Sequence, residues 1–299
     1  MATRTTALGI DIGAGSTKLA LLAGEGGVLA TAQSAAYTQP DLATLTHAIH
    51  EALYQPSNGF AIVADHIARV GLAVPGPVEP GQCKLPRCGN LSALEGVDPA
   101  QWVRGVVGQA SPVRVMTDQH AAAFAAYTAD PQPGRTLYLA LGTGVGGAVL
   151  DEGQPLAFTR GTPGHLGHLD ISGGNPDAPS TPAAGRGALE AYLGAPALRS
   201  RGLPLDDPAR CANHPAMPEV IDAIARGIRI MFALYRMDHI VLLGGVAPVF
   251  TPVLDALAGR IRDGLTPVAP DDWTLSVGSV GLFAGAIGAA RLAQQTAKH

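Results

Sequence analysis

Two pairs of short apolar runs, each joined by a glycine-rich turn, constrain the fold of this chain more than any other feature. The first pair is 7–12 and 18–23, and the second pair is 137–141 and 147–150. Apolar runs of this length, interrupted by glycine, are typical of buried strands joined by tight turns. Because the same pattern occurs twice, the sequence predicts a duplicated α/β unit.

The second glycine turn has the composition of a phosphate-binding loop. It spans 142–147 and reads GTGVGG. Glycine tolerates a positive φ and lets backbone N–H groups approach an anion closely. The stretch 161–168 follows, and its two histidines, His165 and His168, suit polar recognition or a metal. Together these segments indicate an enzyme that handles a phosphate beside a small polar ligand.

The size and hydropathy of the chain indicate a globular protein. Its 299 residues suffice for two domains or one large α/β unit, and 47% of them are hydrophobic. No uncharged apolar run reaches the roughly 18 residues needed to cross a bilayer. Residues 1–6 lead directly into the first apolar run, so we expect no signal peptide and a cytoplasmic location.

Charge and cysteine usage exclude further classes of protein. The net charge is −4, from 20 basic and 24 acidic residues, and no basic block is present. Nucleic-acid affinity depends on clustered positive charge, so we expect no nucleic-acid partner. The three cysteines, Cys83, Cys88 and Cys211, form no C-x-x-C pair, which argues against a disulfide framework and a thiolate zinc site.

The remaining segments predict two α/β lobes with a cleft between them. Strands cluster early and again in the middle of the chain, each time followed by helices. The sequence predicts a smaller lobe over 1–115 and a larger lobe over 116–299, with a C-terminal helix about 281–299 that packs back on the first lobe. The further expected strands are 68–74, Val113–Thr117 and His239–Leu243. The expected helices are Leu42–Tyr54, 121–127, 188–193, Met217–Tyr235, 253–264 and 281–294, and 173–187 is expected to be a loop.

Asp11 stands at the end of the first predicted strand, beside small and hydroxyl residues. An acid in this position can hold phosphate with Mg²⁺, which binds few carboxylates and keeps several waters. A plain β-hairpin with Asp11 capping the turn is the alternative. The candidate phosphate-binding residues of this turn are Asp11, Gly13, Gly15, Ser16, Thr17 and Lys18.

Asp118 stands where a predicted strand gives way to an alanine-rich helix. It can serve as a general base that takes a proton from an alcohol attacking a phosphoryl group. It can equally be an N-cap, since Asp is a preferred capping residue, and the local pattern alone favours the cap.

Four further polar residues are candidate ligand contacts, each with an ordinary structural alternative. Asn90 can bond a ligand hydroxyl but is also a common turn residue. His165 and His168 can bind polyol hydroxyls, and Glu190 alone reads as a solvated helix residue. The run Gly244-Gly245-Val246 can admit a nucleotide ring or form an ordinary turn. In the second glycine turn, the phosphate-binding candidates are Gly142, Thr143, Gly144 and Gly146.

The order of these motifs closely resembles the ROK family of bacterial sugar kinases and repressors, within the actin/hexokinase/Hsp70 fold. The ordered motifs are Asp-Ile-Gly at 11–13, Val-Pro-Gly-Pro at 74–77, Asn-Leu at 90–91, Asp118 before an alanine helix, Gly-Thr-Gly-x-Gly-Gly at 142–147, Gly-His at 167–168, Leu-Glu-Ala-Tyr at 189–192 and Gly-Gly-Val at 244–246. The resemblance covers nearly the whole chain. It implies a two-lobed, ribonuclease H-like ATPase fold and a homodimer.

The resemblance also implies a role for each motif. Asp11 and its turn match the first phosphate motif with a tentative water-mediated Mg²⁺, 142–147 the second, and 244–246 the adenosine motif. Asp118 matches the catalytic base, which overrides the local preference for a cap. Asn90, His168 and Glu190 match positions that bind the sugar. The repressors of the family carry an N-terminal DNA-binding segment, so we expect this chain not to be a repressor.

Three departures from the family pattern stand out. His165 occupies the position of a usual glutamate, so an imidazole that titrates near neutral pH replaces a carboxylate at the sugar. Three zinc-binding cysteines are replaced by Thr181, Ala183 and Ala188. We therefore expect no structural zinc, with the loop 173–182 stabilised by packing instead. The family's Asn-Asp-Ala-Asn is replaced by the sequence 117–120, Thr-Asp-Gln-His.

The sequence thus predicts an ATP- and Mg²⁺-dependent kinase of a hexose or hexose derivative, acting at the C6 hydroxyl with Asp118 as base. Closure of the lobes would exclude water. A polyphosphate-dependent sugar kinase is one alternative, disfavoured by the net negative charge. A non-catalytic sugar-binding protein is the other, disfavoured because such a protein needs neither a base nor phosphate loops.

Overall fold

The computed structural model describes residues 6–54, 67–78, 84–86, 88, 91–108, 111–156, 165–265 and 272–295. The chain divides into two compact units. The first contains Met1–Asp130, Ala157–Thr162 and Val280–His299, and the second contains Pro131–Leu156 and Pro163–Ser279. The boundary after residue 130 differs from the expected boundary at 115, because the helix that begins at Asp118 packs within the first unit.

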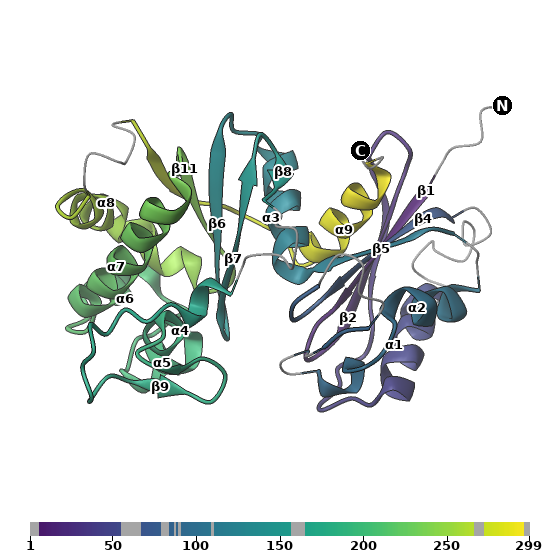
Figure 1. Cartoon of the computed structure of the whole chain (residues 1–299), viewed down its shortest axis with the longest axis horizontal. Coiled ribbons are helices and arrows are strands. Elements are labelled where there is room, and N and C mark those ends of the chain that lie inside the picture. Colours follow the sequence, from purple (N-terminus) through teal and green to yellow (C-terminus); the bar gives the residue numbers. More distant parts are fainter. Residues whose placement is uncertain are drawn as a thin grey trace. The chain divides into compact units, whose positions relative to one another are not determined.

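The first unit is built on a five-stranded mixed sheet in the order β3-β2-β1-β4-β5 (Figure 1). Strands β1, β2 and β3 are antiparallel neighbours, whereas β4 runs parallel to β1 and β5 parallel to β4. The strands are β1 (Thr6–Ile12), β2 (Thr17–Leu22), β3 (Val28–Gln33), β4 (Ile67–Val74) and β5 (Val113–Thr117).

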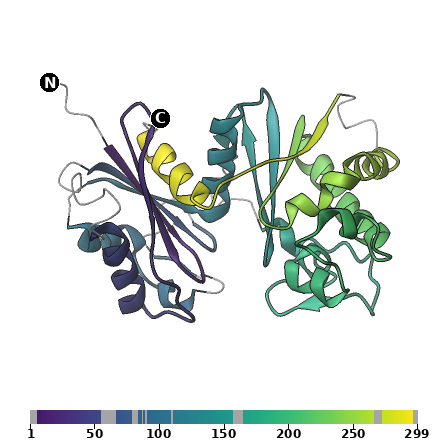
Figure 2. The same cartoon turned by 180° about the vertical axis from the view of Figure 1, so that it is seen from behind.

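Strand alternation gives this sheet two different faces. Because successive side chains point to opposite faces, Leu8, Ile10 and Ile12 lie on one face. They pack in a core with residues of α1 (Leu42–Tyr54) and α2 (Pro99–Val107). The opposite face carries small residues, and there α9 (Ala284–Gln294) contacts the strands. Figures 1 and 2 both show α9, in yellow, beside the strands of this sheet.

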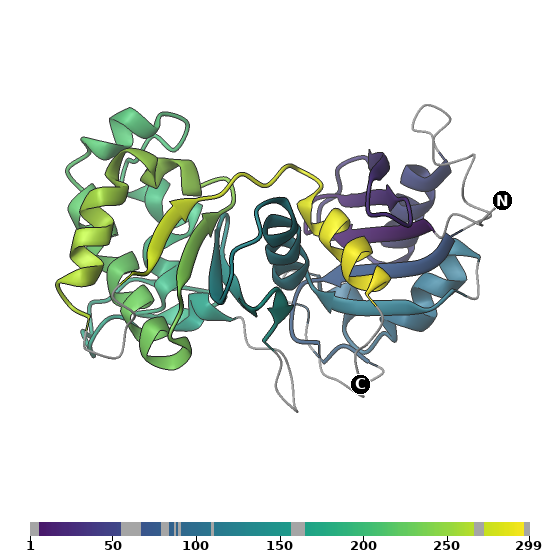
Figure 3. The ribbon, with the colours of Figure 1, turned by 90° about the horizontal axis from the view of Figure 1, so that it is seen from above.

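Three glycines bring α9 into direct backbone contact with its neighbours. A Cβ atom on Gly9 would lie 1.8 Å from the Ala286 carbonyl oxygen, and one on Gly71 would lie 2.0 Å from the Ala289 carbonyl oxygen. On the other side, a Cβ on Gly288 would lie 1.7 Å from a carbonyl oxygen of α3 (Asp118–Ala129). Figure 3 shows α3 and α9 side by side. These positions admit no side chain, so α9 is an integral layer of the first unit.

The second unit contains another five-stranded mixed sheet, in the order β12-β11-β6-β7-β8. Strands β6, β7 and β8 are antiparallel neighbours, and β11 runs parallel to both β6 and β12. The strands are β6 (Arg135–Leu141), β7 (Val145–Asp151), β8 (Gln154–Pro155), β11 (His239–Leu243) and β12 (Thr274–Val277). In both sheets three antiparallel strands are extended by two parallel ones, which confirms the predicted duplication.

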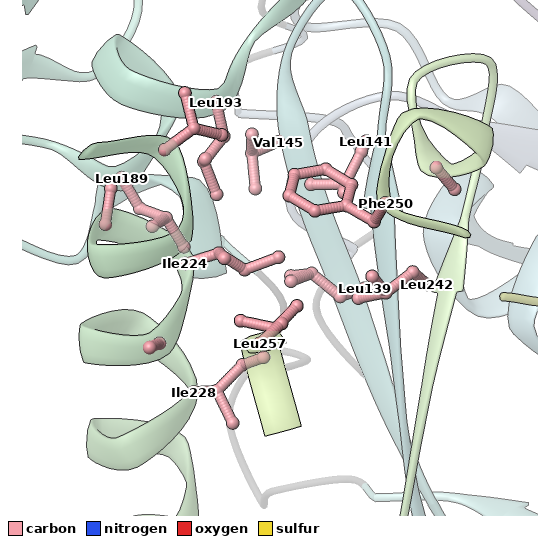
Figure 4. Packing of buried hydrophobic residues seen from close by; sticks show 14 of the residues in the cluster. Leu139, Leu141, Val145, Leu189, Leu193, Ile224, Ile228, Leu242, Phe250 and Leu257 are labelled. Carbon is pink, nitrogen blue, oxygen red and sulfur yellow. The ribbon is translucent and has the colours of Figure 1, made fainter. Parts of the chain in front are cut away.

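Helices pack against the second sheet and share a buried core with it. Figure 4 shows Leu139 and Leu242 of the sheet packed against Ile224, Phe250 and Leu257. The helices are α4 (Leu189–Leu193), α5 (Ala195–Ser200), α6 (Pro208–Ala212), α7 (Met217–Tyr235) and α8 (Leu254–Arg262), with 3₁₀ turns η4 (Leu166–His168) and η5 (Ala247–Val253). The first unit also has a 3₁₀ turn, η3 (Ser92–Leu94).

The expected loop 173–187 contains a two-stranded sheet, β9 (Ser180–Thr181) paired with β10 (Gly185–Arg186). This expectation was wrong because the turn residues of the loop close a hairpin within it. Among the described residues, no helix has both the length and the apolar composition required to cross a membrane.

Candidate functional site

Two carboxylates meet at one edge of the first sheet. Asp11 is near the end of β1 and Asp118 directly follows β5, and Ala73 of β4 pairs with Asp11 on one side and Met116 on the other. Since β1, β4 and β5 are parallel, their carboxyl ends lie at the same edge. Burial and, to a smaller extent, the charge of Asp11 together raise the pKa of Asp118 to about 6. The geometry therefore provides a carboxylate that titrates close to neutral pH.

Asp118 is the first residue of α3 and not its cap. Thr117 is the N-cap, and its hydroxyl accepts the His120 N–H at 3.2 Å. Asp118 Oδ1 accepts the N–H of the next residue, Gln119, at 2.8 Å. The capping alternative for Asp118 is thus wrong, because the preceding threonine already performs that task.

Asp11 is a deeply placed acid with one cation nearby. Burial raises its pKa, and the charge of Lys18, its partner across the β1–β2 pair, opposes this effect. Its carboxylate lies against the first turn of α9, where a Cβ on Gly285 would be 2.4 Å from Asp11 Oδ2. Two facing carboxylates with one ammonium group form a site that a further cation would stabilise.

Hydrogen bonds from Tyr37 hold the turn after Asp11, and no sequence motif indicated this residue. The Tyr37 hydroxyl donates to the Gly13 carbonyl oxygen at 2.8 Å and lies 3.0 Å from Thr17 Oγ1. The Tyr37 N–H donates to the Gly15 carbonyl oxygen at 3.0 Å. Ser16 Oγ accepts from Gln33 Nε2 at 2.9 Å. The hydroxyls of Ser16 and Thr17 therefore have partners inside the protein, and the turn presents its backbone at Gly15.

The structure brings the two glycine turns of the second unit together. They follow β6 and β11, which are parallel neighbours, so both turns lie at the same edge of the sheet. The Val246 N–H donates to the Leu141 carbonyl oxygen at 3.0 Å. Gly244 has a φ of +93°, and a Cβ there would lie 2.3 Å from the same Leu141 oxygen, so only glycine fits.

Two of the glycines in the turn 142–147 are required by packing within the protein. None of the glycines in this turn has a positive φ. Close packing, and not backbone conformation, therefore excludes a side chain at Gly144 and Gly147. A Cβ on Gly144 would lie 2.5 Å from Glu190 Oε2, and one on Gly147 would lie 2.7 Å from a methyl carbon of Leu166. Gly142 instead faces open space, as do Gly15 and Gly245 in the other two turns.

Three of the predicted sugar-binding residues gather around Val145, at the end of this turn. Glu190 Oε2 accepts the Val145 N–H at 3.0 Å. A Cβ on Gly167, between His165 and His168, would lie 2.1 Å from the Val145 carbonyl oxygen. The two imidazoles are exposed and meet edge to face with ring centroids 5.8 Å apart. Partial burial lowers the pKa of His165, and His168 lowers it further. Asn90, the fourth predicted sugar contact, lies outside the described residues.

Hydrogen bonds hold the segment around Thr181 and Ala183, where we expected no structural zinc. The hydroxyl of Thr181 accepts the Ala184 N–H at 3.0 Å, and the Gly187 N–H donates to the Pro179 carbonyl oxygen at 2.8 Å. Within 173–182 residues 173–177 are exposed and Ala178 is buried, so hydrogen bonds accompany the limited packing of this loop. Within the described ranges, no group of three or more His, Cys, Asp or Glu side chains is arranged to hold a metal ion.

His120 is a second feature that the motif order did not explain. Its side chain is 3% exposed, and burial lowers its pKa to about 4, so the ring is neutral at physiological pH. Its Nε2 atom has no hydrogen-bond partner in the part of the chain that the structure describes. A buried ring nitrogen without a partner is uncommon and costs free energy.

Comparison with known proteins places these motifs in context. The sequence profile of the ROK family matches residues 7–296. Over 240 residues the chain is 26% identical to the N-acetylmannosamine kinase of Salmonella typhimurium strain LT2, which covers 76% of this chain and 79% of that protein. Over 184 residues it is 25% identical to the glucokinase of Thermotoga maritima, but this match spans only 52% of this chain and 57% of the glucokinase.

Solved structures show the fold. The ROK hexokinase from Thermus thermophilus superposes with a TM-score of 0.74 and 22% identity, covering 97% of this chain and 98% of that one. A ROK glucokinase from Streptomyces griseus, crystallised with glucose and AMPPNP, gives 0.73 and 22%, covering 97% and 100%. A ROK transcriptional regulator described as a homologue of the E. coli MLC protein gives 0.78 and 20%, covering 97% and 78%. These likenesses confirm the predicted actin-like ATPase fold.

Proposed function

Because this chain belongs to the ROK family, we propose that it is a sugar kinase that transfers the γ-phosphoryl group of ATP to a hexose or hexose derivative. The observation that carries the proposal is the half-buried carboxylate of Asp118, whose pKa is raised to about 6 at the sheet edge it shares with Asp11. A general base works best with a pKa near the operating pH. The kinases among the relatives support this activity.

Asp118 takes the proton from the sugar hydroxyl as that oxygen attacks the γ-phosphorus in line. Its first carboxylate oxygen is oriented by the Gln119 N–H, which fixes the group at the start of α3. The proposed acceptor is the primary hydroxyl at C6. Glu190, His165, His168 and Asn90 are the proposed sugar contacts. Phosphoryl transfer depends mainly on positioning and electrostatics, so the reaction needs one oriented general base and no covalent intermediate with the enzyme.

The described residues fit ATP with a divalent metal. Asp11 is half-buried near a second carboxylate, and this arrangement gains stability when a cation is added. Mg²⁺ prefers one or two carboxylates together with phosphate oxygens and water, and when bound it would neutralise charge on the transferring group. The three turns at Gly15, Gly142 and Gly245 each leave open space where a side chain would stand, which supports close approach of phosphates and the nucleotide to the backbone.

Replacing Asp118 with Ala or Asn tests the base. We expect loss of sugar phosphorylation by at least about 10³-fold in kcat, because proton transfer and charge stabilisation are both removed. Calorimetry should show sugar binding largely retained. Asp130→Asn, at the exposed C-cap of the same helix, is the matched control and should leave turnover unchanged. Retained turnover in the Asp118 variants would remove the assignment.

The donor and the acceptor are tested in one coupled assay. The panel contains glucose, mannose and fructose with their amino and N-acetyl forms, each offered with ATP and with polyphosphate. Turnover with ATP supports the proposal, and turnover with polyphosphate alone would replace the donor. Binding of sugar and ATP analogue without any product would instead indicate a non-catalytic binding protein.

A further inference from the structure

Glu190 is joined to the phosphate turn as well as to the proposed sugar site. Its Oε2 atom accepts the Val145 N–H at 3.0 Å and lies directly against Gly144. Its Oε1 atom accepts the Thr181 hydroxyl at 3.5 Å, from the β9–β10 hairpin. A carboxylate has about four lone-pair positions, so both oxygens retain acceptor capacity for a sugar hydroxyl. One side chain therefore connects the hairpin, the turn 142–147 and the proposed sugar site.

The segment that carries Glu190 holds the same turn at two further points. The Ala195 N–H donates to the Gly142 carbonyl oxygen at 2.8 Å. A Cβ on Gly194 would lie 2.9 Å from the Thr143 carbonyl oxygen, so these backbones are in close contact. Residues 190–195 thus contact four consecutive residues of the turn, 142–145. We name this segment the turn clamp.

The clamp has a rigid base and one adjustable contact. Figure 4 shows Leu189 and Leu193 of α4 packed near Val145 and Leu141, and all four are buried in one core. Interiors of this kind are close-packed and transmit displacement. The Glu190 side chain, in contrast, is only partly buried, and its charge makes the bond to the Val145 N–H stronger than a neutral one. Its rotamer therefore decides how tightly the end of the turn is held.

We propose that Glu190 is a positioning residue that couples sugar binding to the phosphate turn. A sugar hydroxyl bound to this carboxylate fixes its rotamer, and the fixed rotamer orders the Val145 end of the turn before the nucleotide arrives. The nucleotide then binds more tightly, and by linkage it tightens sugar binding by the same factor. This inference rests on the proposed function, because it takes Glu190 as a sugar contact and 142–147 as a nucleotide contact.

The test compares nucleotide affinity with and without sugar in three proteins. Calorimetry would give the Kd of a non-hydrolysable ATP analogue in the presence and absence of whichever sugar the panel identifies. In the wild type we expect the sugar to lower this Kd by about fivefold or more. In Glu190→Gln the ratio should fall towards one, because an amide cannot give two anionic acceptors to the sugar and the turn. Asp255→Asn, an exposed acid-to-amide change in the same unit, should keep the wild-type ratio.

A second measurement requires no ligand and no turnover. Amide hydrogen exchange at Val145 should be faster in Glu190→Gln than in the wild type, whereas exchange within α7 should be unchanged. Thr181→Val, which removes the bond to Oε1 together with the bond that the Thr181 hydroxyl accepts from the Ala184 N–H, should have an intermediate effect. Unchanged exchange at Val145 in Glu190→Gln would overturn the clamp.

The two proposals fail in different ways. A wild type that phosphorylates a sugar, yet binds the analogue equally well with and without it, overturns the coupling and leaves the kinase intact. A coupling that survives in Glu190→Gln overturns the role of this residue. A wild type that turns over no sugar overturns the kinase and the coupling together, while the exchange experiment still decides whether Glu190 holds the turn.

Discussion

At the residue scale, Asp118 combines a catalytic advantage with a structural cost. Burial and the charge of Asp11 raise its pKa to about 6 from an ordinary 3.8. The raised value suits a base near neutral pH, but it also means that the folded protein binds this proton more tightly than the unfolded chain does. The ionised form, which catalysis needs, is therefore the form that the fold stabilises less.

The pH dependence of the rate should report this pKa. The deprotonated carboxylate is the active form, so kcat/KM should rise with pH up to about 6 and level off above it. Below that point it should fall about tenfold per pH unit. Initial rates from pH 4.5 to 8.5, with saturating ATP, would show this fall of kcat/KM on the acidic side of the profile. A profile that stays flat down to pH 4.5 would contradict the raised pKa.

The same shift predicts a stabilising substitution. Ionisation of Asp118 costs stability as pH rises from about 4 to 6, and that cost is fully present at neutral pH. Asn carries no charge and can still accept the Gln119 N–H. Asp118→Asn should therefore raise the free energy of unfolding at pH 8 by about 1–3 kcal/mol, and the gain should vanish near pH 3. Urea unfolding at both pH values measures it, and equal stability at pH 8 would contradict the prediction.

At the element scale, the clearest feature is the backbone contact between α9 and the first sheet. Gly9 and Gly71 stand in the middle of β1 and β4, where glycine normally weakens a strand. Here each leaves space for a carbonyl oxygen of α9. The small residues of α9 are thus required by the sheet it packs on, and a larger side chain at either glycine would separate the layers.

Gly71→Ala should destabilise the first unit strongly. Its methyl group would lie 2.0 Å from the Ala289 carbonyl oxygen, and backbone at this distance cannot yield without moving the helix. We expect a loss of about 2–4 kcal/mol in urea unfolding. Gly105→Ala in α2 is the matched control, since a methyl group there meets nothing within 4 Å and should stabilise the helix by about 0.5–1 kcal/mol. Similar stabilities for the two variants would contradict the packing argument.

Elements with a continuous apolar pattern were predictable from the sequence, and two exposed edge strands were not. The helix Met217–Tyr235 and the strand His239–Leu243 were predicted to the residue, because their apolar residues follow one period throughout. Strands β3 and β12 were missed because they lie at the sheet edges, where half or more of their residues are exposed and no apolar run forms. The start of α3 was placed three residues late, because the capping role of Thr117 was not considered.

Some features of the candidate site follow from the order of the strands, and others depend on tertiary packing. Asp11 and Asp118 were predictable as partners because parallel strands bring their carboxyl ends to one edge. The bond from Val145 to Glu190 spans 45 residues, and the support of the first turn by Tyr37 spans up to 24. Neither leaves a periodic signal in the sequence, since each depends on tertiary packing.

At the scale of the whole molecule, two sheets of equal topology carry different chemistry. The first unit contributes the carboxylates, and the second contributes two glycine turns and the turn clamp. The chain passes from the first unit to the second and then returns, because Val280–His299 belongs to the first unit.

Removing that last segment should affect the two units unequally. A chain truncated after Ser279 retains every strand of both sheets but lacks the layer that covers Gly9 and Gly71. We expect amide exchange in β1 and β4 to become fast while exchange in β6 and α7 stays slow. Equal protection in both units would contradict the assignment of α9 as an integral layer.

This return of the chain has a consequence for synthesis on the ribosome. The strands of the first unit emerge early, but the helix that covers one face of them is translated after every strand of both sheets. The first unit therefore stays unfinished while the whole second unit is translated, because α9 follows β12, the last strand of that unit. The order of translation therefore delays the packing around Asp11 until α9 has left the ribosome, because the Asp11 carboxylate contacts Gly285 of that helix.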